Sequence, residues 1–205
     1  HGIVDTPRLD AEVLLADVLD TDRVGLYVNY DKPLSSMELG MYREVVRKRA
    51  RRMPVAYIIG KKDFMSGQYQ VNQSVLIPRP ETELLLEETH KYLKELDVTP
   101  ERCVDLGTGS GILAIELAKT YEALHVYAVD ISGEALDVAR LNAKEHGVLD
   151  RITFVCGDLF APLAGMVEPE SVELLISNPP YIATRDLDRL QPEVSRFEPR
   201  VALDG

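Results

Sequence analysis

The sequence predicts an α/β fold with parallel strands, preceded by a small helical domain. From residue 101 onward, short apolar runs of strand length alternate with segments of helical periodicity, which is typical of a parallel sheet with helices on both faces. Two segments before residue 53 have helical periodicity. The 205 residues exceed a typical domain of roughly 100–150, so one large domain or two small ones would fit.

The N-terminal part is expected to contain two short helices. Residues 7–19 carry apolar side chains at helical spacing, and residues 35–52 follow a serine N-cap at Ser35 or Ser36. Helices of this length need partners, so we expect a small helical domain over residues 1–53.

Residues 54–77 are expected to form a β-hairpin linker. Asp63–Met65 and Tyr69–Val71 flank Ser66-Gly67, a turn-forming dipeptide. A helix is then expected to begin at Pro80, because proline is favoured at the first helical position.

The third predicted domain covers residues 78–205. Its expected strands are Arg102–Leu106, His125–Asp130, Ile152–Cys156 and Val172–Ile176, and its expected helices after residue 101 are Gly111–Thr120 and Gly133–His146. Ligands of such sheets bind beyond the carboxyl ends of the strands, where the strand order reverses. The residues that follow these strands are therefore the candidate functional residues.

A glycine-rich loop, D-L-G-T-G-S-G over residues 105–111, follows the first of these strands. Its glycines allow a tight turn and a close approach of ligand to backbone. The spacing differs from the dinucleotide fingerprint G-x-G-x-x-G, since position 112 is isoleucine. The Asp105 carboxylate would repel a pyrophosphate and suits a cationic amine. This charge pattern favours S-adenosylmethionine, which has an amine, a sulfonium and ribose hydroxyls and no phosphate, over a dinucleotide.

Acidic residues follow the next two strands. Asp130 ends its strand 19 residues after Gly111, where a carboxylate can accept hydrogen bonds from ribose hydroxyls. Asp158 can accept the adenine amino group while Leu159 packs on the ring. An N-cap role for Asp158 remains an equal alternative. The candidate cofactor residues are Asp105, Gly107, Thr108, Gly109, Ser110, Gly111, Asp130, Asp158, Leu159 and Asn178.

The stretch Asn178-Pro179-Pro180-Tyr181 follows the fourth strand and supplies the candidate catalytic residues. Two prolines cannot continue the strand, so they force a rigid loop. The side-chain oxygen of Asn178 and the carbonyl of Pro179 could accept the two hydrogens of a planar –NH2 group, with Tyr181 packed beside it. The alternative is a turn in which Asn178 caps backbone groups. The cofactor loop favours the first interpretation.

Composition limits the function classes. The net charge of −11 argues against direct nucleic-acid binding, which needs clustered Lys and Arg. One basic run exists, namely Arg43, Arg47, Lys48, Arg49, Arg51 and Arg52. We interpret it as a solvated helix face, with a docking patch for an acidic partner or RNA as the alternative.

Cysteine and histidine usage gives no sign of a metal site. Cys103 and Cys156 lie in apolar runs and are expected to be small core residues. The four histidines, His1, His90, His125 and His146, form no metal-spaced pair and are expected to be structural or exposed. The sequence has neither a signal-peptide pattern nor an apolar run of membrane-spanning length, so we expect a reducing, cytoplasmic setting.

The loop at 105–111, Asp130 and the Asn-Pro-Pro-Tyr stretch together resemble class I S-adenosylmethionine-dependent methyltransferases that act on a planar nitrogen. Four further segments resemble the peptide chain release factor glutamine N5-methyltransferases over nearly the entire chain: Pro7–Glu12, Pro54–Gly60, Val75–Glu83 and Glu198–Gly205. The resemblance implies a Rossmann-like fold, a cofactor site at residues 107–111, and a target glutamine held by Asn178 to Tyr181. Leu159 departs from the aromatic residue that some relatives have there.

The same resemblance implies a partner and a longer chain. The substrate would be the glutamine of the Gly-Gly-Gln loop in bacterial class 1 release factors, docked by the helical domain, with no membrane and no requirement for the ribosome. The family's sheet has seven strands, and four are counted here, so we expect C-terminal strands to be missing and the fourth strand to expose an edge. The alternatives are an adenine methyltransferase acting on nucleic acid and a cofactor-binding fragment without turnover.

Overall fold

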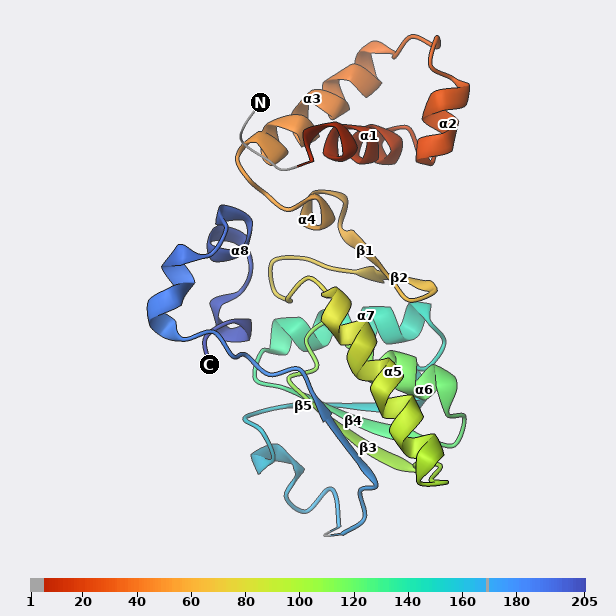
Figure 1. Ribbon diagram of the computed structural model, residues 1–205, viewed down its shortest axis with the longest axis vertical. Coiled ribbons are helices and arrows are strands. Elements are labelled where there is room, and N and C mark those ends of the chain that lie inside the picture. Colours follow the sequence, from red (N-terminus) through yellow and green to blue (C-terminus); the bar gives the residue numbers. More distant parts are fainter. Residues whose placement is uncertain (1–5, 169) are drawn as a thin grey trace. The chain divides into compact units, whose positions relative to one another are not determined.

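The computed structural model describes residues 6–168 and 170–205; His1 lies outside them. The chain divides into two compact units (Figure 1). The first comprises the chain up to Gly60 together with Leu190–Phe197, and the second comprises Lys61–Arg189 with Glu198–Gly205. The chain therefore returns briefly to the first unit after Arg189. The division after Gly60 places the hairpin expected in the linker within the second unit.

The first unit is helical. Its helices are α1 (Pro7–Val18), α2 (Arg23–Val28), α3 (Ser36–Ala50), α4 (Val55–Ile59) and α8 (Pro192–Phe197). The helices predicted over 7–19 and 35–52 are confirmed as α1 and α3, and α3 begins with a capping box between Ser35 and Glu38. Helices α2 and α4 were not predicted, because six and five residues are too few to show a period.

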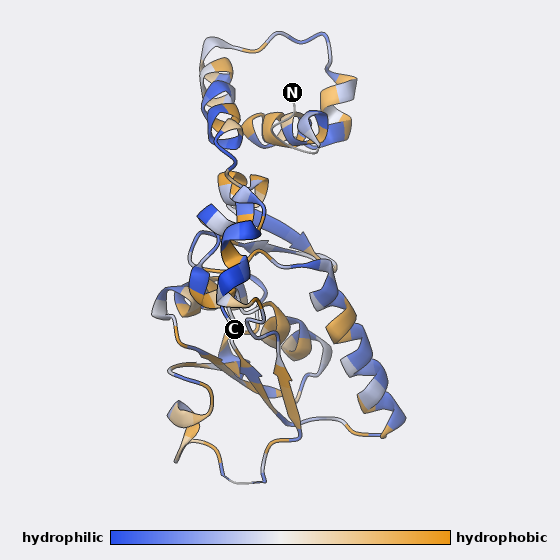
Figure 2. Ribbon diagram, turned by 60° about the vertical axis from the view of Figure 1, so that its left-hand side comes forward, coloured by the Kyte–Doolittle hydropathy of each residue, from blue (hydrophilic) through white to orange (hydrophobic). Residues whose placement is uncertain are grey.

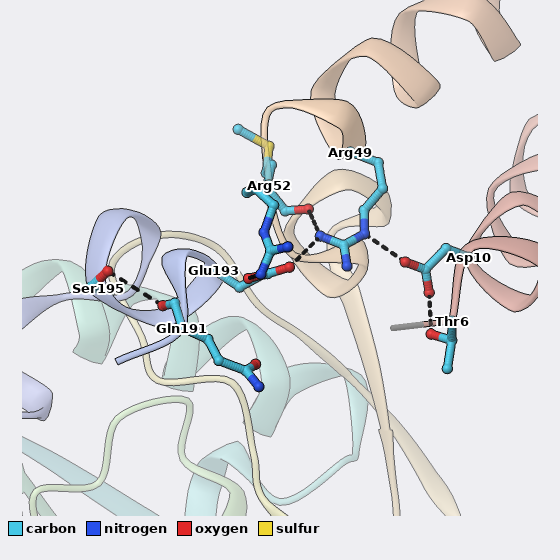
Figure 3. A network of polar contacts seen from close by, with 8 residues as sticks. Thr6, Asp10, Arg49, Arg52, Gln191, Glu193 and Ser195 are labelled. Carbon is cyan, nitrogen blue, oxygen red and sulfur yellow. Dashed lines mark hydrogen bonds and ion pairs between the residues drawn. The ribbon is translucent and has the colours of Figure 1, made fainter. Parts of the chain in front are cut away.

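An ion-pair network joins α1, α3 and α8 within the first unit (Figure 3). Arg49 donates from Nε to Asp10 Oδ2 at 2.6 Å and from Nη1 to Glu193 Oε1 at 3.0 Å. Arg52 donates to the other oxygen of Glu193 at 2.5 Å. The expected solvated basic face is therefore wrong for these two arginines. Arg43, Arg47, Lys48 and Arg51 are exposed, as predicted.

The second unit contains, among the described residues, a four-stranded sheet in the order β5-β4-β3-β6. Its strands are β3 (Arg102–Leu106), β4 (His125–Asp130), β5 (Ile152–Cys156) and β6 (Leu174–Ser177). All three pairings are parallel, so the predicted parallel sheet is confirmed. The last strand begins two residues later than predicted. Glu173 instead uses its side chain to accept a hydrogen bond from the Arg102 backbone at 2.8 Å.

The helices of the second unit are α5 (Pro80–Glu95), α6 (Ile112–Thr120) and α7 (Gly133–Glu145). Single turns of 3₁₀-helix lie at Leu149–Arg151, Ala161–Leu163 and Arg200–Ala202, with a longer one at Thr184–Arg189. Alternate strand residues pack into two clusters, one on each face of the sheet. In Figure 2 much of the parallel sheet is hydrophobic, as expected for parallel strands, whereas the hairpin is largely hydrophilic.

Helices cover one face of this sheet in the described residues. The larger cluster includes side chains of α5, α6 and α7. The cluster on the opposite face contains Leu163 from a 3₁₀ turn and the non-helical Val167 and Val172, and no residue of an α-helix among the described residues. The prediction of helices on both faces is therefore wrong for the described part of the chain. Strand β6 lies at an edge of the described sheet, next to β3.

The hairpin consists of β1 (Lys61–Phe64) and β2 (Gly67–Gln70). Phe64 pairs with Gly67, so the turn is Met65-Ser66 and not Ser66-Gly67 as predicted. Met65 adopts a left-handed φ of 48°, which sequence rules assign to Gly or Asn. Packing fixes the register, because it buries Phe64 and Tyr69 on the same face.

The cysteines and histidines occupy structural positions. Cys103 is buried in β3 as expected, but Cys156 is exposed because it ends β5, an edge strand of the described sheet. His90 contacts the Tyr121 hydroxyl at 3.0 Å, His125 contacts Thr153, and His146 stacks on Tyr69. No group of three or more His, Cys, Asp or Glu in the described residues could hold a metal ion. No helix in the described ranges is long and apolar enough to cross a bilayer.

Candidate functional site

A cavity of roughly 270 Å³ lies at the carboxyl ends of the strands. This volume is close to the lower end of the range for small-molecule sites, about 300–1,000 Å³. The cavity lies where the chain order reverses, since β4 and β6 flank β3 on opposite sides. Eight predicted cofactor residues line it: Gly107, Thr108, Gly109, Ser110, Asp130, Asp158, Leu159 and Asn178.

The glycine loop has the conformation that its sequence predicts. Gly107 and Gly109 have left-handed φ values of 72° and 54°. The backbone N–H groups of Gly107 and Thr108 both donate to the Val129 carbonyl, at 2.8 and 3.0 Å. A Cβ added at Gly107 would meet nothing within 4 Å, so bare backbone faces open space there. A ligand can therefore approach the backbone of this loop closely.

Asp130 faces the cavity and also shapes the loop. Its Oδ2 accepts from the Gly109 N–H at 2.8 Å, and its Oδ1 accepts from the Ser132 N–H at 2.9 Å. Each carboxylate oxygen can accept two hydrogen bonds. Asp130 therefore keeps the capacity to accept from two hydroxyl groups of a ligand.

Asp105 is fully buried and does not line the cavity. Its Oδ2 accepts from the Thr108 hydroxyl at 2.6 Å. Burial raises the pKa of Asp105 to about 7, against the opposing hydrogen bond from Thr108. Thr108 lines the cavity, so Asp105 affects the site indirectly, by orienting the Thr108 hydroxyl.

The residues after β5 settle one alternative. The next helical turn, Ala161–Leu163, has Phe160 at its N-cap and no side-chain cap bond, so Asp158 is not its N-cap. Asp158 and Leu159 both line the cavity. Leu159 has a φ of 47° and is 59% exposed, which leaves its side chain accessible to a ligand.

The loop after β6 brings part of the predicted acceptor site to the cavity. Asn178 and Pro180 line it, while Pro179 and Tyr181 are absent from its lining in the described residues. Asn178 Nδ2 donates to Thr82 Oγ1 at 3.4 Å, which leaves Oδ1 as its acceptor end. Tyr181 is 78% exposed. The turn-capping alternative for Asn178 predicts backbone partners, whereas this bond runs to a side chain on α5.

The segment at residues 198–205 packs against the acceptor loop. The Ile182 N–H donates to the Leu203 carbonyl and the Gly205 N–H donates to the Ile182 carbonyl, both at 3.0 Å. A Cβ at Gly205 would lie 2.8 Å from the Cα of Tyr181, so this close approach requires glycine.

Sequence reasoning missed one group of lining residues. Ser74, Val75, Leu76, Pro78, Thr82, Val201 and Ala202 also line the cavity. The side chain of Glu198 fastens two of these segments together, because it pairs with Arg79 and accepts from the Ile77 N–H at 3.3 Å. The segments Val75–Glu83 and Glu198–Gly205 carried the resemblance. Neither the spacing nor the periodicity of the sequence indicated that these two segments lie together at the cavity.

The charges that line the cavity fit the expected cofactor. Two carboxylates, Asp130 and Asp158, line the cavity, and no Lys or Arg of the described residues does. An acidic lining suits a cationic ligand that has hydroxyl and amino donors, and it disfavours a phosphate. The open backbone at Gly107 supplies the space for it.

Comparisons with known proteins find similarity in both parts of the chain. A family profile described as the PrmC N-terminal domain matches residues 1–60, and one described as a methyltransferase small domain matches residues 81–191. A release factor glutamine methyltransferase of Geobacter sulfurreducens is 44% identical over 98% of this chain and 68% of its own length. The chain belongs to the release factor glutamine methyltransferase family. Relatives with the same description from Chlorobaculum tepidum and Rhodopirellula baltica are 45% and 41% identical, over 98% and 97% of this chain and 69% and 67% of theirs.

Membership in the release factor glutamine methyltransferase family confirms several predictions. The fold class, the enzyme class and the cofactor, S-adenosylmethionine, are those expected from the sequence. Both the helical N-terminal part and the α/β part match, so the membership does not depend on the cofactor loop alone.

Proposed function

We propose that this chain transfers a methyl group from S-adenosylmethionine to the N5 side-chain amide of the glutamine in the Gly-Gly-Gln loop of release factors. One observation carries the proposal: Asn178 lines the same cavity as the glycine loop and Asp130. An acceptor for a planar –NH2 group therefore lies beside the cofactor loop.

The cofactor would be held by residues at or just after the carboxyl ends of three of the strands, β3, β4 and β5. Asp130 would accept from the ribose hydroxyls, and Asp158 with Leu159 would contact the adenine. The loop would contact the cofactor through Gly107 to Ser110, whereas Gly111, also predicted to do so, does not line the cavity and packs against α7. Asp105 would act indirectly, by fixing the Thr108 hydroxyl. When bound, S-adenosylmethionine supplies an electrophilic methyl group on a sulfonium.

The acceptor loop would orient the target amide. An amide nitrogen is a poor nucleophile, because its lone pair is delocalised into the carbonyl. Asn178 Oδ1 and the carbonyl of Pro179 would accept its two N–H bonds, with Pro180 and the exposed Tyr181 alongside. Alignment of this kind can supply up to ~7–11 kcal/mol of the barrier.

The same acceptors would stabilise the positive charge that grows on the nitrogen during transfer. No ionised base is needed at this stage, since the proton leaves after the methyl group has been transferred. The chain's contribution is then geometric and electrostatic. Asn178 is the residue on which it chiefly depends.

The helical first unit would dock the release factor. It exposes the large apolar side chains Val24, Tyr27, Val28 and Tyr30 on and just after α2. Exposed apolar surface of this kind is typical of protein interfaces. A protein substrate agrees with the net charge of −11, which disfavours nucleic acid. We place the reaction in the cytoplasm, where release factors work, without a membrane or the ribosome.

The test uses the full-length protein, tritiated S-adenosylmethionine and a purified release factor. We expect label on the factor and none on a variant with Gln→Ala in its Gly-Gly-Gln loop. Asn178→Ala should lose turnover while its affinity for S-adenosylhomocysteine stays unchanged. Asp130→Ala should weaken that affinity first. Equal labelling of the loop variant, or label on DNA or RNA alone, would refute the proposed substrate.

A further inference from the structure

We propose that Asn142 on α7 is a positioning residue for the cofactor loop, which it ties to the β1–β2 hairpin. The inference rests on the assignment of residues 107–111 to S-adenosylmethionine. Asn142 itself does not line the cavity, so its effect would be indirect.

Asn142 is completely buried, and its side-chain amide makes three hydrogen bonds. Oδ1 accepts from the Gln70 N–H at 2.7 Å, and Nδ2 donates to the carbonyls of Gln70 and Ser110 at 3.1 and 2.8 Å. All three partners are backbone groups of fixed type. The orientation of the amide is therefore determined by its partners, because a flipped amide would face each of them with the wrong group.

A second contact from the same helix reaches the next residue of the loop. Gly111 has a left-handed φ of 80°, and a Cβ placed there would lie 2.9 Å from the Cβ of Ala139. Ala139 and Asn142 are three residues apart, so they share one face of α7. This face holds the loop at two adjacent residues, by packing at Gly111 and by a hydrogen bond at Ser110.

The hairpin is fastened to the same helix. Besides the bonds between Asn142 and the Gln70 backbone, Tyr69 stacks on His146 with ring centroids 4.3 Å apart. The Gln70 side chain donates to Glu145 at 2.7 Å. Asn142 differs from these other contacts because it alone among them also bonds the cofactor loop. Its loss should therefore change the loop, whereas the loss of the Gln70 side chain should not.

The experiment measures binding of S-adenosylhomocysteine to the full-length protein by calorimetry. Asn142→Asp keeps the shape and the acceptor for the Gln70 N–H, but it turns oxygen instead of N–H toward two carbonyls. We expect about tenfold weaker binding at unchanged stoichiometry. Asn142→Ser, too short to span the partners, should weaken binding similarly. Gln70→Ala is the matched control and should stay within about twofold of the wild type.

A merely structural residue would give another result. Its loss would lower the fraction of protein that binds, and so the stoichiometry, while the dissociation constant of the remainder stayed the same. That outcome would overturn the proposal, as would equal weakening in Gln70→Ala or failure of both Asn142 variants to fold. Release factor is not needed for this measurement. A wild type that binds S-adenosylhomocysteine and fails to methylate a release factor would refute the proposed substrate alone.

Discussion

The amide of Asn178 has two different ends, and the proposed chemistry needs only the oxygen. The Nδ2 donates to Thr82 Oγ1 at 3.4 Å, and Thr82 is only 4% exposed at the start of α5. With the nitrogen engaged there, the oxygen remains to accept from a substrate N–H. Thr82 lies in the segment Val75–Glu83 that carried part of the resemblance, but its contact with Asn178, which sets the orientation of that amide, is visible only in the structure.

Replacing Thr82 should therefore impair turnover more than cofactor binding. Thr82→Val keeps the shape and removes the hydroxyl, and we expect about a tenfold lower kcat, with Thr82→Ser close to the wild type. S-adenosylhomocysteine affinity should not change. The matched control is Thr89→Val in the same helix, whose hydroxyl donates to the Leu85 carbonyl at 2.7 Å. Equal kcat losses at both positions would contradict this role.

Asp105 makes stability depend on pH. Burial raises its pKa to about 7 in the folded protein, from an ordinary value of 3.8. Because the folded pKa is the higher one, this group's stabilising contribution is complete below pH 4 and is lost as the pH rises through 7. The physical reason is that ionisation in a buried site has no solvation to support it.

Asp105→Asn should remove this dependence. The variant keeps an acceptor for Thr108, so its melting temperature relative to the wild type should increase between pH 5 and pH 8. Each kcal/mol relieved raises it by about 2–4 °C. Thermal melts of the unliganded protein across this range would decide. A constant difference at all pH values would mean that Asp105 does not titrate in this range.

Among the elements, strands and long helices follow their sequence patterns closely. Strands β3, β4 and β5 begin and end where the apolar runs do, since a parallel strand must be apolar on both faces. The short segments are different. The turn Met65-Ser66 depends on the packing of Phe64 and Tyr69, which a local pattern does not contain. Helices α2 and α4 are too short to show a period.

The segment 198–205 is an element that tertiary contacts define. Its anchor is Glu198, whose side chain is 1% exposed and pairs with Arg79, which is 34% exposed. The carboxylate also accepts from the Ile77 backbone. One buried side chain thereby holds two segments at the cavity.

Glu198→Gln should destabilise the fold. The variant keeps the shape and loses the charge. We expect a loss of about 1–3 kcal/mol, less than for a fully buried pair, because Arg79 is partly solvated. Denaturant titration measures it. Arg200→Gln breaks an exposed pair with Asp204 at 3.4 Å and should change stability by less than about 0.5 kcal/mol. Similar losses in both variants would refute the anchoring role of Glu198.

On the scale of the whole molecule, the chain crosses between its two units more than once. Residues 190–197 belong with the helical unit, although both flanking segments belong with the sheet. Glu193 fastens residues 190–197 to the helical unit through ion pairs with Arg49 and Arg52 (Figure 3). The three side chains are 14–23% exposed, so solvent screens them less than a surface pair.

Glu193→Gln should release residues 190–197 from the helical unit. We expect faster amide hydrogen exchange over this segment, because a neutral side chain cannot compensate two arginines. The control is Glu44→Gln, which breaks an exposed pair with Arg47 on the same helix α3. Exchange in the sheet of the second unit should not change in either variant. Unchanged exchange at 190–197 in Glu193→Gln would show that the ion pairs do not hold it.

The sequence by itself determined the parallel strands and indicated the candidate cofactor loop and acceptor tetrapeptide, because glycine, proline and apolar periodicity constrain the backbone locally. The glycine loop, Asp130 and the tetrapeptide together indicated the cofactor, whereas the charge of Asp105 was a wrong argument for it, because Asp105 is buried and does not line the cavity. Only the tertiary structure decided the contacts of Thr82, Asn142 and Glu198, which lie 96, 32 and 121 residues from Asn178, Ser110 and Ile77. Such partners are far apart in the sequence and are brought together by the fold. Their spacing in the sequence therefore has no period to recognise.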